Sequence, residues 1–174
     1  MITFRRSGGI LAACGLFLAV GCSQQRPSER DINRQLAISR SEVKRAELNE
    51  VAGRYAGTLR SGDTYEQSVI LVLQVRDVPE ENPTEGMDPV TVPKLVGYLR
   101  FLYGNEDNGE YSDAPVRDAE YYAGRKLLNV VVTHSQFQDL ILNLTAQPRA
   151  ATGTWSAAAV GVSGTAQFTL ESGN

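Results

Sequence analysis

Cysteine and histidine are scarce in this sequence, and their scarcity excludes several kinds of site. The two cysteines are residues 14 and 22, so the chain from Ser23 onward contains none. A disulfide framework and thiol chemistry are therefore excluded for that part of the chain. His134 is the single histidine, whereas a histidine-ligated metal site or a catalytic triad needs further partners nearby. We expect no metal and no cofactor, and Thr133-His134-Ser135-Gln136 predicts a tight turn with His134 exposed.

Basic charge is also in short supply. The chain has 17 Lys and Arg against 20 Asp and Glu; without Arg5 and Arg6 the basic residues number 17 − 2 = 15, and the net charge is 15 − 20 = −5. A nucleic-acid partner needs a basic face, so none is expected. Ser41 and Lys44 have Ser-x-x-Lys spacing, but the companion motifs of that chemistry and a glycine-rich phosphate loop are missing. The sequence therefore predicts that the protein is not an enzyme.

A long apolar run occurs at the N-terminus. After Arg5 and Arg6, residues 7–21 carry no charge, which is the layout of a secretory signal too short for a lasting membrane span. The run ends in Leu18-Ala19-Val20-Gly21-Cys22, which resembles the lipobox of bacterial lipoproteins. That resemblance implies a signal peptide over residues 1–21, cleavage before Cys22, diacylglycerol on the Cys22 sulfur and a fatty acid such as palmitate on the new amine. The alternatives are an ordinary signal peptide with an incidental cysteine, or a buried N-terminal helix.

A second segment of lipobox type, Leu11-Ala12-Ala13-Cys14, competes with the first. Its use would leave only residues 7–13 as the apolar stretch, so Cys22 is the predicted lipidation site. Ser23 follows Cys22, and by resemblance to the sorting rule of enteric bacteria the lack of aspartate there implies the outer membrane. We therefore expect a protein of the bacterial cell envelope that is held on a membrane through lipid on Cys22.

The segment after Cys22 is polar. Residues 22–28 are predicted to be a flexible tether, and Ser28 is placed to cap a helical segment over residues 29–51. The apolar residues of this segment form a rough helical stripe, interrupted by serines: Ile32, Leu36, Val43, Ala46 and Val51, with Ser39 and Ser41 between them. We expect one or two short helices that lie against the following domain or act as a stalk. A partner-binding amphipathic helix is the alternative.

From residue 52 to 174 the hydrophobic period changes to two, which predicts an antiparallel β-domain. Seven segments alternate in this way, around residues 55–59, 69–75, 95–103, 128–132, 140–144, 153–155 and 162–170, and an eighth is possible near Tyr121 and Tyr122. Short connections favour an up-and-down barrel, or a curved meander of seven to eight strands whose edge is covered by the N-terminal helix. The outward positions of a membrane-spanning barrel would be apolar, whereas those expected here include Gln74, Arg100, Gln138 and Gln167.

The first of these segments, Gly53-Arg54-Tyr55-Ala56-Gly57-Thr58-Leu59, resembles the first strand of lipocalin-like bacterial lipoproteins, including those linked to copper handling and envelope stress. The copper-linked proteins have Cys-x-x-Cys just after this strand. Here Arg60-Ser61-Gly62-Asp63 stands in that place, so thiolate metal binding is not carried over. Lipocalins have Gly-x-Trp where this chain has Gly53-Arg54-Tyr55.

Acidic residues gather in two expected loops. One contains Asp77, Glu80, Glu81, Glu85 and Asp88, and the other Glu106, Asp107, Glu110, Asp113, Asp118 and Glu120. Calcium binding is one interpretation, because calcium takes several oxygen ligands at close range. Successive loops of a meander emerge at opposite ends, however, so the two groups are not expected to converge, and solvated loops that deter aggregation are the favoured interpretation.

Two functions from different classes remain. The first is a non-catalytic accessory protein with a filled core that docks to another envelope protein. The alternative is a lipocalin-like carrier of a small lipophilic or envelope-derived ligand. The residues expected to point inward, and to contact such a ligand, are Tyr55, Leu73, Leu99, Phe101, Leu142, Trp155 and Phe168. Strand number does not choose between the two, because eight-stranded barrels are either packed solid or hollow enough for one ligand. Trp155, which has small neighbours, is predicted to be buried.

Overall fold

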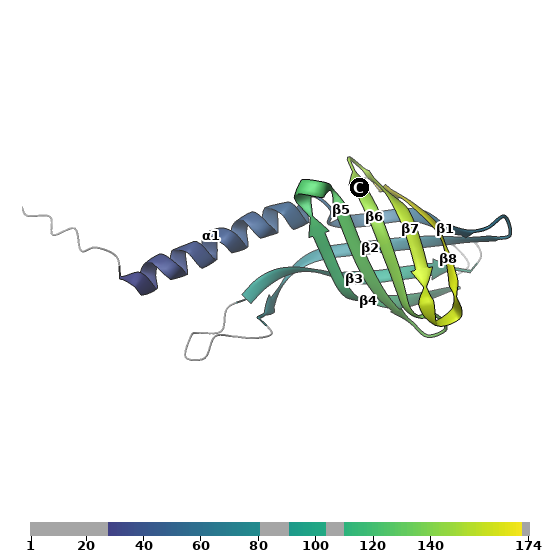
Figure 1. Ribbon diagram of the computed structural model, residues 1–174, viewed down its shortest axis with the longest axis horizontal. Coiled ribbons are helices and arrows are strands. Elements are labelled where there is room, and N and C mark those ends of the chain that lie inside the picture. The colour runs from purple at the N-terminus through teal and green to yellow at the C-terminus, as the bar shows by residue number, and fades with distance from the viewer. Residues whose placement is uncertain (1–27, 81–90, 104–109, 172–174) are drawn as a thin grey trace, which may run out of the picture.

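The computed structural model describes residues 28–80, 91–103 and 110–171, and it consists of one helix followed by eight strands (Figure 1). The helix is α1 (Glu29–Asn49). The strands are β1 (Gly53–Ser61), β2 (Tyr65–Pro79), β3 (Thr91–Leu102), β4 (Tyr111–Tyr122), β5 (Leu127–His134), β6 (Gln138–Gln147), β7 (Ala150–Ala157) and β8 (Val162–Leu170). Single 3-10 turns, η2 (Ala123–Arg125) and η3 (Ala158–Val160), connect β4 to β5 and β7 to β8.

Each strand pairs antiparallel with the next along the chain, and β8 pairs with β1, so the sheet closes into a barrel. The predicted up-and-down barrel of seven to eight strands is therefore confirmed, and β4 is the eighth strand expected near Tyr121 and Tyr122. Closure joins Tyr55 to Leu170 and Arg60 to Thr165. The curved sheet with a helix over its edge is not formed, because a closed barrel has no edge to cover.

Period-two patterning places the apolar residues inside the barrel. On β2, for example, Val69, Leu71 and Leu73 are at most 1% exposed, while the outward Gln74 is exposed. The predicted polar positions Gln138 and Gln167 are also exposed. The same alternation on the other strands builds one continuous hydrophobic core, which extends to Leu48 and Val51 at the end of α1.

Two inward glycines let neighbouring strands approach closely. A Cβ atom on Gly97 would lie 1.8 Å from the carbonyl oxygen of Val72, and one on Gly153 would lie 2.0 Å from that of Asn143. Both distances are far inside van der Waals contact, so neither position has room for a side chain. Glycine at such points relieves crowding where strands bend around a small barrel.

The expected N-terminal helix is confirmed as a single element of 21 residues, which continues through Ser39 and Ser41. Ser28 caps it as predicted, since its side chain accepts a hydrogen bond from the backbone N–H of Asp31 while the Asp31 side chain accepts from that of Ser28. At 1.5 Å per residue the helix is about 30 Å long. Its N-terminal part projects beyond the barrel, whereas its C-terminal part runs beside the extended ends of β2 and β3 (Figure 1).

The prediction of two acidic loops was wrong for four residues, because they lie on strands. Asp113, Asp118 and Glu120 belong to β4, which begins at Tyr111, and Asp77 belongs to β2. The β2–β3 and β3–β4 connections leave the barrel at opposite ends, as expected for a meander. The predicted loop residues that lie outside the described part are Glu81, Glu85, Asp88, Glu106 and Asp107. Among the described residues, no group of three His, Cys, Asp or Glu side chains is placed to hold a metal ion.

Candidate functional site in the barrel interior

All seven residues predicted to contact a ligand point into the barrel and are buried. Their exposed fractions run from 0% for Leu99 and Leu142 to 5% for Tyr55, and the others lie between: Leu73, Phe101, Trp155 and Phe168. They do not gather in one place, however. Tyr55 lies near the start of β1, where its hydroxyl donates to the Val51 carbonyl at 3.0 Å, and Phe101 lies near the end of β3 toward the opposite end of the barrel.

Bulky side chains occupy the barrel along its length. Those with less than 2% exposure on inward positions include Trp155, Phe101, Leu59, Leu71, Leu73, Leu99, Leu128, Leu140, Leu142 and Leu144. The interior of an eight-stranded barrel is just wide enough to be filled by side chains. The seven candidate residues therefore pack within the core rather than around a shared opening.

Trp155 shows how the core is fitted together at the end of the barrel away from α1. Its side chain is 1% exposed, so its predicted burial is confirmed, and Nε1 donates to the Arg60 carbonyl on β1 at 3.0 Å. The strand between them is β8, where Gly164 pairs with Trp155. A Cβ atom on Gly164 would lie 1.7 Å from the Arg60 oxygen and 2.8 Å from Trp155 Nε1. Gly164 thus leaves the space through which the indole reaches β1, and Tyr65 packs on the indole at a centroid distance of 5.9 Å.

His134 is not an exposed turn residue, and that prediction was wrong. It is 4% exposed, because it is the last inward position of β5 after Val130 and Val132. Its ring lies 4.6 Å from that of Phe101 and 4.8 Å from that of Phe137. The alternation along β5 was the sequence signal that could have placed it inside.

The two nitrogens of His134 differ in their environment. Nδ1 accepts hydrogen bonds from the backbone N–H groups of Gln136 and Phe137, at 3.1 and 3.3 Å, and so holds the β5–β6 turn. Nε2 is buried without a hydrogen-bond partner in the described structure. Because Nδ1 is an acceptor, the neutral ring carries its proton on Nε2. Burial lowers the pKa of His134 by disfavouring the charged imidazolium.

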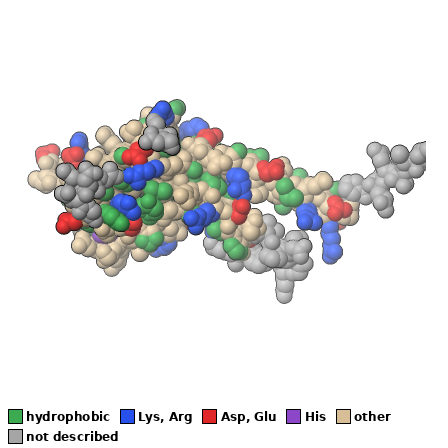
Figure 2. All heavy atoms as spheres, turned by 180° about the vertical axis from the view of Figure 1, so that it is seen from behind, with side chains coloured by type: hydrophobic (Ala, Val, Ile, Leu, Met, Phe, Trp, Pro, Cys, Tyr) green, Lys and Arg blue, Asp and Glu red, His purple; other side chains and the backbone are tan. Residues whose placement is uncertain are grey.

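Arg100, which was expected to point outward, is tightly paired on the outer surface, and its partners were not predicted from the sequence. Arg100 on β3 makes two hydrogen bonds to the Asp113 carboxylate on β4, at 2.7 and 2.9 Å. Its guanidinium carbon lies 4.0 Å from the ring centroid of Tyr111 and 5.3 Å from that of Tyr98. The hydrogen bonds from Arg100 lower the pKa of Asp113. On the face of the molecule shown in Figure 2, basic and acidic side chains are interspersed.

Polar contacts fasten the C-terminal half of α1 to the rim of the barrel. Lys44 Nζ donates to the Tyr121 carbonyl at 3.3 Å, and Arg45 pairs with Asp77 on β2. Glu50, just after the helix, accepts from Lys126 Nζ at 2.7 Å and from the Tyr121 hydroxyl at 3.0 Å. The Lys126 bond, followed by the Tyr121 bond, lowers the pKa of Glu50. These contacts fix the direction in which α1 leaves the barrel.

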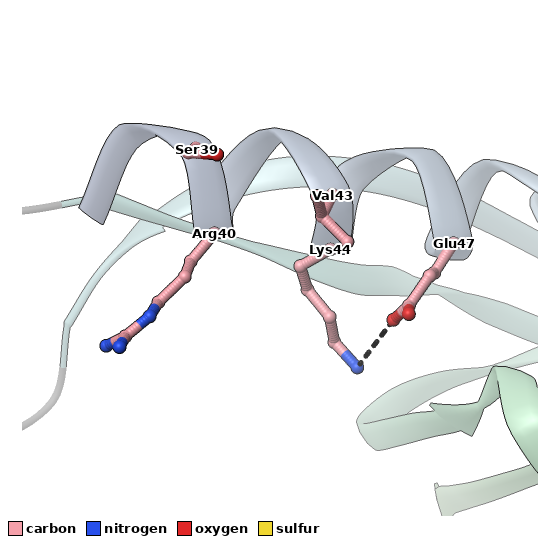
Figure 3. Close-up of a pocket in the computed structure, with 5 residues that line it drawn as sticks. All are labelled: Ser39, Arg40, Val43, Lys44 and Glu47. Carbon is pink, nitrogen blue, oxygen red and sulfur yellow. Dashed lines mark ion pairs between the residues drawn. The ribbon is translucent and has the colours of Figure 1, made fainter. Parts of the chain in front are cut away.

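A shallow hollow lies on the surface of α1, lined by Ser39, Arg40, Val43, Lys44 and Glu47 (Figure 3). Lys44 and Glu47 form an ion pair of 4.0 Å at its border. Val43 is 59% exposed, so the hollow is open to solvent rather than part of the core.

By its architecture the protein is an eight-stranded up-and-down barrel with a projecting N-terminal helix. No family model, curated protein or solved structure matches the chain. Within residues 28–80, 91–103 and 110–171, no helix is both long and apolar enough to cross a bilayer. The predicted signal peptide, Cys22 and the tether as far as residue 27 lie outside the described residues.

Proposed function

We propose that this protein is a bacterial envelope lipoprotein, anchored to the outer membrane by lipid on Cys22, with a non-catalytic accessory role in which it docks to another envelope component. The observation that carries the accessory role is the filled interior of the barrel. Its core positions hold Trp155, Phe101 and a series of leucines at 2% exposure or less. A barrel packed in this way offers its outer surface and loops, rather than its interior, to other molecules.

The N-terminal part of the chain supports the anchored arrangement. Six residues, Ser23–Ser28, separate the lipobox cysteine from the first residue of α1. The helix then adds about 30 Å, and its contacts with Asp77 and Tyr121 hold it in a fixed direction from the barrel rim. A lipid on Cys22 would thus hold the barrel at the end of a short tether and a stalk.

The anchor is tested by comparing Cys22→Ala with Cys14→Ala. We expect Cys22→Ala to abolish incorporation of labelled fatty acid and to leave the precursor uncleaved or released from the membrane, because the acceptor sulfur is missing. Cys14→Ala should be labelled, processed and sedimented with membranes like the unsubstituted protein. Labelled, processed Cys22→Ala protein in the membrane fraction would refute the anchor.

A lipocalin-like carrier of a small lipophilic or envelope-derived ligand is the second candidate, and one observation favours it. Within the part of the chain that the structure describes, the buried Nε2 of His134 has no hydrogen-bond partner, and it lies among aromatic rings. Ligand sites are commonly apolar with a few polar groups that fix orientation. The bulk of the surrounding side chains favours the filled scaffold over this carrier.

Probe binding distinguishes the two candidates, with Trp155 as the reporter. The emission of this single tryptophan should be blue-shifted, because the indole is buried. For a filled barrel we expect a lipophilic fluorescent probe to leave this emission unchanged, since close-packed cores have no room for a ligand. Saturable one-to-one binding at about micromolar concentration, typical of ligands held in a preformed pocket, would instead establish the carrier. Weakening of that binding by a larger or polar residue at Phe101 or Leu142 would locate it in the barrel.

A further inference from the structure

Three residues of the predicted helical stripe, Ile32, Leu36 and Val43, face solvent and not the barrel, whereas Val51, just after α1, belongs to the core. Ile32, Leu36 and Val43 are 43%, 50% and 59% exposed. Leu36 and Arg45 are 45 − 36 = 9 residues apart, which at about 100° per residue places them on opposite sides of the helix. Arg45 pairs with Asp77 on β2, so Leu36 points away from the extended ends of β2 and β3. Packing against the barrel therefore does not explain why these three positions are apolar.

The part of the helix that carries Ile32 and Leu36 projects beyond the barrel (Figure 1). Of the buried core residues, α1 contributes Leu48, which lies near its C-terminal end. Ile32 and Leu36 lie in the first turns instead, next to the tether. Two of the three exposed stripe residues thus lie where the chain approaches the predicted anchor, and Val43 follows further along the same face.

We propose that this stripe, Ile32, Leu36 and Val43, docks on the surface of the lipid bilayer that holds Cys22. This inference rests on the proposed function, because it takes the lipid on Cys22 as given. Six residues of tether span at most about 21 Å when extended, which keeps the first turns of α1 within reach of the headgroups. An amphipathic helix binds there by sinking its apolar face into the boundary between headgroups and acyl chains.

The tether removes the need for a strong intrinsic affinity. A short flexible linker holds the stripe at an effective concentration of about millimolar relative to its binding surface. A modest apolar face is then sufficient, although it would not recruit a free protein to a membrane. Docking would tilt α1 toward the bilayer and, because the helix is fastened at Lys44, Arg45 and Glu50, would set the orientation of the barrel as well.

A second copy of the chain fits the stripe less well. In a heptad arrangement Leu36 and Val43 share one core position with Glu29, while Ile32, Ser39 and Ala46 occupy the other. The second position thus includes a polar side chain and a small one, which interrupts the continuous apolar seam that pairs helices. A bilayer needs no matching side chains, so the interruption costs little there.

The chain supplies a matched control for the test. Leu36 and Ile38 are 50% and 52% exposed on the same helix, but two residues apart they point about 200° away from each other. We would introduce Leu36→Cys or Ile38→Cys into the full-length protein, produce it lipidated and attach a nitroxide. The introduced cysteine is the one free thiol, because Cys14 leaves with the signal peptide and the Cys22 sulfur is alkylated.

The labelled proteins are reconstituted into vesicles of phosphatidylethanolamine and phosphatidylglycerol, and paramagnetic relaxation by oxygen and by a water-soluble nickel complex is measured. We expect the oxygen-to-nickel accessibility ratio to be severalfold higher at position 36 than at position 38, because oxygen concentrates in the bilayer. Leu36→Asp should release the helix from the surface, seen as a higher nickel accessibility for a label at position 32, while Ile38→Asp should leave that label unchanged.

Each other outcome identifies a different failure. Equal ratios at positions 36 and 38 would overturn the docking. Dipolar broadening at position 36 that disappears on dilution with unlabelled protein would assign the stripe to a second copy and would also overturn it. Mass spectrometry of the N-terminal peptide is the independent readout. An acylated Cys22 with a water-exposed label at position 36 refutes the docking alone, whereas an unacylated Cys22 refutes the proposed anchor and the docking with it.

Discussion

Trp155→Ala is expected to lower the free energy of unfolding by about 3–5 kcal/mol, the usual cost of truncating a buried tryptophan. The indole is 1% exposed and spans from β7 across Gly164 to the Arg60 carbonyl on β1. Its removal opens a cavity beside Tyr65 and also leaves the Arg60 oxygen without its indole donor. Urea unfolding followed by circular dichroism measures the change, since the variant has no tryptophan emission.

Two comparison variants separate packing from hydrogen bonding. Trp155→Phe retains an aromatic ring but not the Nε1 donor, and should cost about 1–3 kcal/mol. Val160→Ala, at a position 46% exposed, should change stability by less than about 0.5 kcal/mol. A Trp155→Ala loss no larger than the Val160→Ala loss would show that the indole does not hold the barrel together.

Acidification from pH 7 to 5 is expected to destabilise the protein through His134. Burial lowers the pKa of His134 in the folded state below the ordinary value of 6.5. Below that value the unfolded chain binds a proton that the folded protein does not, so stability falls as the pH falls. The slope reaches up to about 1.4 kcal/mol per pH unit for one proton, and it levels off below the folded-state pKa. Well above pH 6.5 His134 is uncharged in both the folded and the unfolded state, and this loss of stability disappears.

The interactions lost on protonation of His134 explain why stability falls as the pH falls. A proton on Nδ1 would displace the hydrogen bonds from Gln136 and Phe137, and the resulting charge would lie against the rings of Phe101 and Phe137. His134→Leu should be less stable at pH 7, because it loses these bonds, but its unfolding midpoint in urea should vary little between pH 7 and 5. The pKa values of Asp113 and Glu50 are lowered by their partners, so the stability that these carboxylates contribute is lost only at lower pH. Parallel pH profiles for the variant and the unsubstituted protein would contradict the assignment to His134.

Strand β4, which the sequence predicted only as a possibility, differs from the clearly predicted strands in its inward residues. On β2 and β6 the inward positions are leucine and valine, so alternation was evident. On β4 they include Ser112, Ala114 and Ala119, while its outward positions carry charges, so the apolar period is weak and the segment was interpreted as an acidic loop. Its place in the sheet is determined by pairing with the strands on either side, which a linear pattern does not contain.

The sequence predicted which residues point into the barrel, but it did not predict which residues they contact there. Alternation placed Tyr55, Leu99 and Phe168 inside, and the burial of Trp155 was anticipated from its small neighbours. The glycine that makes room for the indole is Gly164, which depends on the β7–β8 register. His134 was misplaced because the turn after it outweighed the alternation of β5 before it.

Closure of the barrel by its first and last strands has a consequence for how the chain reaches its native state. Tyr55 and its partner Leu170 are 170 − 55 = 115 residues apart. During synthesis β1 can pair with β2 as soon as that hairpin emerges, but its other edge stays unpaired until residues 165–170 arrive. Contacts of such sequence separation form slowly, and an unpaired edge invites association with other chains. The barrel is therefore completed only when nearly the whole chain is available, and until then one edge of β1 is open to association with other chains.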